Sequence, residues 1–327
     1  MTDIHQLLHD QFGFSQFRGV QREVVERVLA GEGTLAVMPT GSGKSLCYQL
    51  PSLVRRGTGI VISPLIALMT DQVRSAEANG IRAAALTSAS SDPRGIRDAL
   101  LGGQLDLLYV APERATTEGF AALVQELDIA LFAIDEAHCV SEWGHDFRPD
   151  YRLLRGLLDQ HREVPRLALT ATADRRTRED ILVQLGIPQD GCIVAGFDRP
   201  NIRYHVVPRD GLPGQLKALA KANPGPGIVY APSRNGAEKI AEQLLGSGRP
   251  ALAYHAGLEA EIRHRNQDAF VQSEEMVMAA TIAFGMGIDK PDVRFVAHAA
   301  TPKSIEAYYQ ETGRAGRDGD PAEAWLF

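Results

Sequence analysis

The segment at residues 37–45 has residue types and spacing suited to binding phosphate. Residues 34–38 are apolar and partly β-branched, which predicts a buried strand, and residues 46–53 predict the start of a helix. Backbone N–H groups at such a junction point into the turn, and the helix dipole favours an anion there. Lys44 can reach the β- and γ-phosphates of a nucleotide, and the Ser45 hydroxyl can ligate Mg²⁺. The residues expected around the phosphates are Thr40, Gly41, Ser42, Gly43, Lys44 and Ser45.

This loop is not a complete match to the phosphate-loop pattern, because Met38 stands where the pattern has its first glycine. An ordinary glycine-rich turn with a surface lysine is the alternative. A second group of residues favours the nucleotide site.

An acidic pair follows the apolar run at residues 129–134. Asp135 and Glu136 would lie at the C-terminal end of that strand, which is the Walker B arrangement. Asp135 would then hold Mg²⁺, directly or through water, and Glu136 would orient and deprotonate an attacking water. Two adjacent carboxylates at this place are costly unless a metal neutralises one of them. A solvated acidic turn is the alternative.

Composition sets the class of protein but does not identify a partner. The chain has 327 residues, 44% of them hydrophobic and 23% charged, which suits a globular protein of about two domains. No run approaches the ~20 apolar residues needed to cross a bilayer, and the N-terminus lacks a secretory pattern, so we expect a cytoplasmic protein without membrane contact. Three widely spaced cysteines predict neither disulfides nor a zinc site. The net charge of −7 gives no support for nucleic-acid binding and does not exclude it.

The order of apolar runs predicts two α/β domains. Strands are expected at 34–38, 59–63, 82–86, 106–110, 129–134 and 166–170, and most of these runs are continuously apolar, as in a parallel sheet covered on both faces. A second series is expected at 203–207, 227–230, 251–254, 276–280, 293–298 and from 322. The boundary should fall near 197–200, giving domains 1–197 and 198–327. Functional turns should lie at the C-terminal ends of the strands. The apolar start of a strand at the chain end favours a longer parent protein.

With the two motifs above, further blocks make the chain resemble the catalytic core of RecQ-family DNA helicases, in superfamily 2. These blocks are the segments 12–21, 141–149, 197–204 and 310–319, and the resemblance covers essentially the whole chain. It implies two tandem RecA-like domains, each a mainly parallel sheet flanked by helices, with ATP and Mg²⁺ bound between them. It also implies 3′→5′ movement on single-stranded DNA and at single-strand/duplex junctions, in repair and recombination near a bacterial nucleoid.

The resemblance implies an adenine site in the first block. The Gln21 amide can both donate to and accept from the adenine edge, and Arg18 and Phe14 can stack on the base or brace it. Packing of the phenylalanines between helices is the alternative. In the second domain the resemblance adds Asp289 as a ribose partner and Gln310 from the last motif as further nucleotide contacts.

The segment 141–149 is expected to connect DNA to hydrolysis. Trp143 and Phe147 offer faces for stacking unpaired bases, and Arg148 can pair with phosphate. A hydrophobic plug is the alternative. Thr170 and Thr172 either couple the phosphate site to the DNA site or cap the next helix. The other DNA contacts that the resemblance implies are Ser63, Ser233, Arg234, His255 and Thr281.

Arg314 and Arg317 are three residues apart, which predicts that they share one helical face. The resemblance makes Arg317 the arginine finger and Arg314 a companion contact to the γ-phosphate, with surface arginines paired to Glu311 and Asp318 as the alternative. An RNA helicase of the same superfamily, or a nucleotide-gated clamp without productive hydrolysis, are the rival functions. The first is disfavoured by segments 12–21 and 141–149, the second by Glu136 and Arg317.

Overall fold

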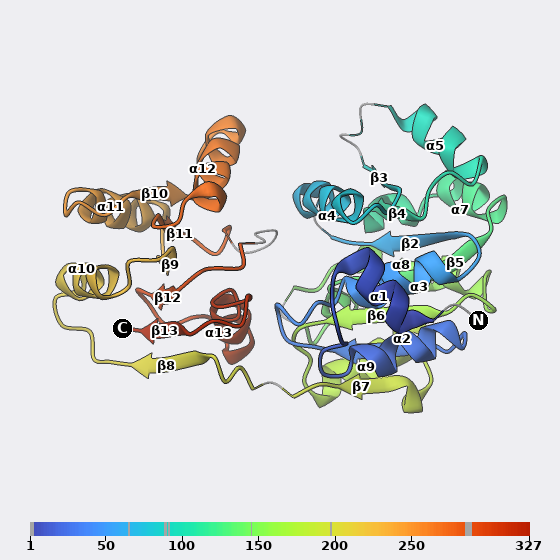
Figure 1. The fold of residues 1–327 in the computed structure, drawn as a ribbon, viewed down its shortest axis with the longest axis horizontal. Helices are drawn as coiled ribbons and strands as arrows, with labels where there is room; N and C mark the ends of the chain where they lie inside the picture. The colour runs from blue at the N-terminus through green and yellow to red at the C-terminus, as the bar shows by residue number, and fades with distance from the viewer. Residues whose placement is uncertain are drawn as a thin grey trace. The chain divides into compact units, whose positions relative to one another are not determined.

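A computed structural model of the protein describes residues 3–64, 66–87, 90, 92–144, 146–196, 198–284 and 290–327. The chain forms two compact units, Met1–Phe197 and Asp198–Phe327. Each unit is a parallel sheet with helices on both faces (Figure 1). The predicted fold class, two RecA-like α/β domains in tandem, is confirmed.

The sheet of unit 1 has the strand order β3-β4-β2-β5-β6-β1-β7, all parallel. Its strands are β1 (Thr34–Val37), β2 (Thr58–Ile62), β3 (Ala83–Leu86), β4 (Leu107–Val110), β5 (Ile129–Ile134), β6 (Arg166–Thr170) and β7 (Cys192–Val194). Six of them fall where the apolar runs predict strands. The edge strand β7 was missed, because three residues are too few to give a periodic signal.

Helices cover both faces of this sheet because successive strand residues point to opposite sides. Along β1, Leu35 and Val37 belong to one core cluster, and Ala36 belongs to the other. The helices of unit 1 are α1 (Ile4–Phe12), α2 (Gln21–Leu29), α3 (Leu46–Val54), α4 (Ile66–Ala78), α5 (Pro93–Leu101), α6 (Pro112–Ala115), α7 (Glu118–Gln125), α8 (Pro149–Asp159) and α9 (Arg175–Leu185). Helices α2, α3 and α4 contribute to the second cluster, and α5, α7, α8 and α9 to the first.

The sheet of unit 2 has the strand order β10-β11-β9-β12-β13-β8, again all parallel. Its strands are β8 (Ile202–Val206), β9 (Gly227–Tyr230), β10 (Ala251–Tyr254), β11 (Val277–Ala280), β12 (Phe295–His298) and β13 (Ala322–Leu326). Its helices are α10 (Leu212–Ala222), α11 (Arg234–Leu245), α12 (Ala260–Gln272) and α13 (Ile305–Thr312). Helices α10 and α11 pack on one face of the sheet and α12 packs on the other.

Among the described residues, no helix combines the length and the apolar character needed to cross a membrane. The same residues contain no cluster of three or more metal-binding side chains from histidine, cysteine, aspartate and glutamate.

Candidate nucleotide and DNA sites

The glycine-rich loop lies between β1 and α3, as predicted. Its glycines are required by the backbone: Gly41 has φ 79° and Gly43 has φ 74°, in the left-handed region that other residues rarely adopt. Lys44 Nζ folds back over the loop and donates to the carbonyls of Met38 (3.3 Å) and Pro39 (3.5 Å). Thr40, Ser42 and Ser45 are half-buried around it. The Lys44 side chain therefore lies over the loop, and backbone carbonyls of the loop accept from its ammonium group.

Gln21 reaches this loop from the start of α2. Its Nε2 donates to the carbonyls of Ser42 (2.8 Å) and Gly43 (3.2 Å), and its Oε1 accepts from the Arg18 N–H (2.8 Å). A Cβ at Gly43 would lie 2.5 Å from Gln21 Nε2, so the contact also requires glycine there. An adenine bound by Gln21 would have to compete with the loop for this amide.

The two other side chains of this block lie together at the surface. The Arg18 guanidinium is 5.8 Å from the centre of the Phe14 ring, and Phe14 is 46% exposed. Phe12 and Phe17 instead pack against the core of α1, α2 and α3. The helix-packing alternative therefore applies to these two and not to Phe14.

Asp135 lies at the end of β5 and is buried. Its Oδ1 accepts from the Glu136 N–H (3.0 Å) and its Oδ2 from Gln72 Nε2 of α4 (3.5 Å). Burial, together with the charge of Glu136, raises the pKa of Asp135 to about 6, and the positive charge of Lys44 opposes this rise. Carboxylate oxygens are the ligands that a hard divalent cation such as Mg²⁺ favours, so the buried Asp135 beside Glu136 fits the predicted metal.

Glu136 begins a chain of contacts that leads to β6. Its backbone has φ 48°, which is unusual for a residue other than glycine and is held by the surrounding fold. Its Oε2 lies 3.3 Å from His138 Nδ1, and that nitrogen lies 3.0 Å from Thr170 Oγ1. Thr170 Oγ1 donates to the carbonyl of Thr172 (3.1 Å). Thr170 is thus linked to the acidic pair through His138 and is not a helix cap. The linking residue, His138, was given no role from the sequence.

Among the described residues of the loop 141–149, Trp143 is the aromatic side chain that is exposed to solvent. Trp143 is 54% exposed, and the Arg176 guanidinium of α9 lies 3.2 Å from its ring centre. Phe147 is less exposed and has Arg152 of α8 5.3 Å from its ring centre. The two arginines were missed, because nothing in the sequence connects them to these rings. The exposure of Trp143 argues against the plug alternative for that residue.

Arg148 is already engaged in this structure. It contacts the Asp146 carboxylate at 3.3 Å and donates to the carbonyl of Pro64 at 2.9 Å. Tyr151 of the adjoining α8 donates to the main-chain carbonyl of Asp135 (3.0 Å). The loop is therefore tied to both the end of β2 and the acidic pair. His145 lies outside the described residues.

The remaining predicted DNA contacts follow strand ends, but two of them are enclosed. Ser63, after β2, is fully buried. His255, after β10, is buried between Glu238 Oε1 (3.1 Å from Nε2) and the Gly257 N–H, which donates to Nδ1 (3.2 Å). These environments correct the expectation of direct contact: His255 shapes its turn, and the side chain of Ser63 faces the protein interior.

Three other residues gather at one edge of the unit 2 sheet, because β10, β11 and β9 are neighbours. Ser233, after β9, caps α11 by accepting from the Gly236 N–H (3.1 Å), which is a structural role. Arg234 follows it, and its side chain lies against Gly257. Thr281 follows β11 and is half-buried. Asp289 lies outside the described residues.

Arg314 and Arg317 do not share a helical face, and that prediction was wrong. Helix α13 ends at Thr312, and both arginines lie in the turns that lead into β13. These turns precede a strand, whereas the other predicted functional turns follow one. Gly316, with φ 54°, puts a left-handed residue between the two arginines, so no regular helix runs from one to the other. Arg314 is buried and hydrogen-bonds the phenol of Tyr230 at the end of β9, whereas Gln310 is half-buried on α13.

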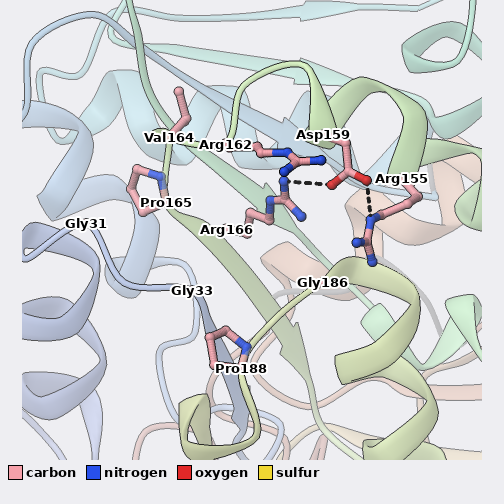
Figure 2. Close-up of a pocket in the computed structure, with 10 residues that line it drawn as sticks. All are labelled: Gly31, Gly33, Arg155, Asp159, Arg162, Val164, Pro165, Arg166, Gly186 and Pro188. Atoms are coloured by element: carbon pink, nitrogen blue, oxygen red, sulfur yellow. Dashed lines mark hydrogen bonds and ion pairs between the residues drawn. The ribbon is translucent and has the colours of Figure 1, made fainter.

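A pocket of about 350 Å³ in unit 1 lies away from these groups, at the N-terminal ends of β1 and β6 (Figure 2). Asp159 is placed there between Arg155 (2.7 Å) and Arg166 (3.1 Å). Arg166 also donates to the carbonyls of Leu185 (2.8 Å) and Leu158 (2.7 Å). These arginines satisfy the last carbonyls of α8 and α9, which is a structural task.

Comparison with known proteins decides the family. The family model of DEAD/DEAH box helicases matches residues 18–181, and that of the helicase conserved C-terminal domain matches residues 212–319. Proteins described as ATP-dependent DNA helicase RecQ are 50% identical over 324 residues in Haemophilus influenzae and 45% identical over 326 residues in Bacillus subtilis. The chain belongs to the RecQ family of DEAD/DEAH box helicases. The predicted resemblance is thus confirmed.

Each comparison covers almost all of this RecQ-family chain but only part of the relative. The matches cover 98% of the chain and 52% and 55% of the two bacterial proteins, so the chain spans about half their length. Among solved structures, helicase Lhr of Mycobacterium smegmatis bound to ssDNA and AMP-PNP has a TM-score of 0.74 at 22% identity, covering 100% of this chain and 47% of that one. DEAD-box helicase Mss116 bound to ssRNA and UDP-BeF has 0.79 at 16%, covering 100% and 75%. At such identities the likeness supports the fold alone.

Proposed function

We propose that this chain is the motor of a DNA helicase, which hydrolyses ATP with Mg²⁺ and moves 3′→5′ on single-stranded DNA and at junctions with duplex. The observation that carries the proposal is the meeting of Lys44, Asp135 and Glu136 at the C-terminal edge of one sheet, where the lysine opposes the raised pKa of a buried carboxylate. The family membership supports repair and recombination on bacterial chromosomal DNA as its setting.

The residues divide the chemistry as follows. Lys44 leaves the Met38 and Pro39 carbonyls and neutralises the β- and γ-phosphates, while Gln21, with Phe14 and Arg18, contacts the base. Ser45 and Asp135 hold Mg²⁺, which would supply positive charge beside the phosphates. Glu136 takes the proton from the water that attacks the γ-phosphate, and Arg314 and Arg317 stabilise the charge on the transferring phosphoryl group.

DNA acts on this chemistry through the loop 141–149. A base stacked on Trp143 contributes about 1–3 kcal/mol, and any shift of the loop reaches Asp135 through Tyr151. Arg234 and Thr281, on one edge of the unit 2 sheet, contact the backbone of the strand. The route from Trp143 to the acidic pair gives DNA a physical means of changing the hydrolysis rate.

The test is steady-state phosphate release by the whole chain with single-stranded DNA, with single-stranded RNA and without nucleic acid. We expect many turnovers, strong stimulation by DNA over RNA, and loss of turnover in Lys44→Ala. Equal or greater stimulation by RNA would favour the RNA-helicase alternative. Nucleotide-dependent DNA binding without multiple turnovers would favour the clamp. Unwinding of a forked duplex is then measured separately from translocation.

A further inference from the structure

Arg199 and Asn201, at the start of unit 2, contact a segment more than a hundred positions later in the chain. Arg199 Nη1 donates to the carbonyl of Gly313 (3.3 Å), and Nη2 donates to the carbonyls of Ala315 (2.9 Å) and Gly316 (2.9 Å). Asn201 Nδ2 donates to the carbonyls of Gly316 (2.8 Å) and Asp320 (3.0 Å). The two side chains therefore hold the turns between α13 and β13 by five hydrogen bonds.

These turns carry Arg314 and Arg317, and they lie outside any helix or strand. Backbone carbonyls beyond the end of a helix need hydrogen-bond donors from elsewhere in the protein. Here the guanidinium group of Arg199 and the side-chain amide of Asn201 are those donors. Arg317 follows Gly316, whose carbonyl accepts from both side chains. A shift of either donor would therefore move the backbone next to Arg317.

The close contacts around position 316 require glycine there. Its φ is +54°, and a Cβ there would lie 2.5 Å from Asn201 Nδ2 and 2.7 Å from the Asp320 carbonyl oxygen. The strands add to this fixing, because the Ala322 N–H donates to the Asn201 carbonyl (2.9 Å) where β8 and β13 pair. Burial lowers the pKa of Arg199, although a guanidinium remains charged at neutral pH. Its charge is thus placed against backbone carbonyls inside unit 2.

We infer that Arg199, assisted by Asn201, is a positioning residue that sets Arg314 and Arg317 for phosphoryl transfer. This inference rests on the proposed function. Arg199 acts through the backbone of residues 313–316 and touches no phosphate itself. Its loss should lower the rate of the chemical step and leave ATP and DNA binding in place.

The experiment compares Arg199→Ala with Arg249→Ala in the whole chain. Arg249 is a matched control, because it is also partly buried in unit 2 and donates to backbone carbonyls, those of Asn223 and Gly225. A misplacement of about 1 Å can cost about 100-fold in rate, so we expect kcat of Arg199→Ala to fall at least about 10-fold. The KM for ATP and the DNA concentration for half-maximal stimulation should change less than about 3-fold. Arg249→Ala should keep kcat within about 2-fold of wild type.

Two further measurements separate positioning from general damage. Binding of ADP should be unchanged in Arg199→Ala, while binding of ADP with aluminium fluoride, a mimic of the transferring phosphoryl group, should weaken. In an Arg317→Ala background, Arg199→Ala should cause a smaller loss than it does alone, because the part of its effect that acts through Arg317 is already gone. Asn201→Ala, which keeps the cation, should give a smaller loss of the same kind.

The outcomes are distinguishable. If Arg317→Ala leaves turnover intact, the proposed role of the arginine finger fails. If Arg317→Ala abolishes turnover but Arg199→Ala has normal kcat, or if the two losses multiply in the double variant, the positioning inference alone is overturned. Equal damage by Arg199→Ala and Arg249→Ala would also overturn it, since any buried arginine would then have the same effect.

Discussion

Asp135→Asn should stabilise the folded chain in the absence of nucleotide and metal, even though it removes a residue proposed to hold Mg²⁺. In the folded chain, burial and the charge of Glu136 raise the pKa of Asp135 from 3.8 to about 6. The folded state therefore binds this proton more tightly than the unfolded state does. The contribution to stability is fully present below about pH 4 and is lost as the pH rises through about 6.

The size of the effect follows from that difference. About two pH units at about 1.4 kcal/mol each give about 3 kcal/mol of destabilisation from ionised Asp135 above pH 7. An amide has no charge to desolvate, and its oxygen can still accept from the Glu136 N–H. Its new NH₂ group would face Gln72 Nε2, and a turn of the Gln72 amide by about 180° brings Oε1, which is buried without a hydrogen-bond partner among the described residues, into place as the acceptor. The substitution should therefore gain up to about 3 kcal/mol at pH 7.5 but only about 1 kcal/mol at pH 4.5.

Urea unfolding at these two pH values measures the difference. The chain has two tryptophans, so a Trp325→Phe background leaves Trp143 as the reporter of unit 1. Asp106→Asn is the control: although burial opposes it, the hydrogen bonds and charge of Arg82 lower the pKa of Asp106, so this change should destabilise at pH 7.5. A stability gain for Asp135→Asn that is absent at pH 7.5, or equal at both pH values, would show that the carboxylate is not strained by burial.

Four other substitutions test the DNA-coupling loop, the arginine finger and the strained glycines. Trp143→Ala should weaken the stimulation of ATP hydrolysis by DNA far more than the basal rate, and equal loss of both rates would refute a coupling role for the loop. Arg317→Ala should abolish turnover, a loss on the order of 10³-fold or more, and spare ATP binding; an ATP affinity that fell in parallel with kcat would make it a binding residue. Gly57→Ala should cost more than about 2 kcal/mol in urea unfolding, because Gly57 has φ 101° and the new Cβ would lie 2.2 Å from the Asp128 carbonyl oxygen. Gly103→Ala, with φ 65° and open space around it, should cost only about 1 kcal/mol, and similar losses for both would contradict the steric explanation.

Most of the fold could be predicted from local signals. A parallel strand that is buried on both faces must be apolar at nearly every position, so strands such as β2 and β5 are visible as continuous apolar runs. The same logic located Lys44 and Asp135, because a strand end followed by glycines or carboxylates is a local pattern. The three-residue strand β7 has no such pattern. Helical spacing also misplaced Arg314 and Arg317, because helix α13 ends at Thr312 and the turns that follow it are held by Arg199 and Asn201, more than a hundred positions earlier in the chain.

The sequence by itself therefore determined the family, the two α/β units and the identity of the chemical groups, since each of these depends on neighbours in the chain. Only the tertiary structure decided how those groups are held. The contacts that hold them join residues up to 117 positions apart. They are Gln21 on the phosphate loop, His138 between Glu136 and Thr170, Arg176 over Trp143, and Arg199 on the turn at 313–316. Such contacts are fixed by which strands lie side by side and which helix covers them, and no spacing along the chain encodes that.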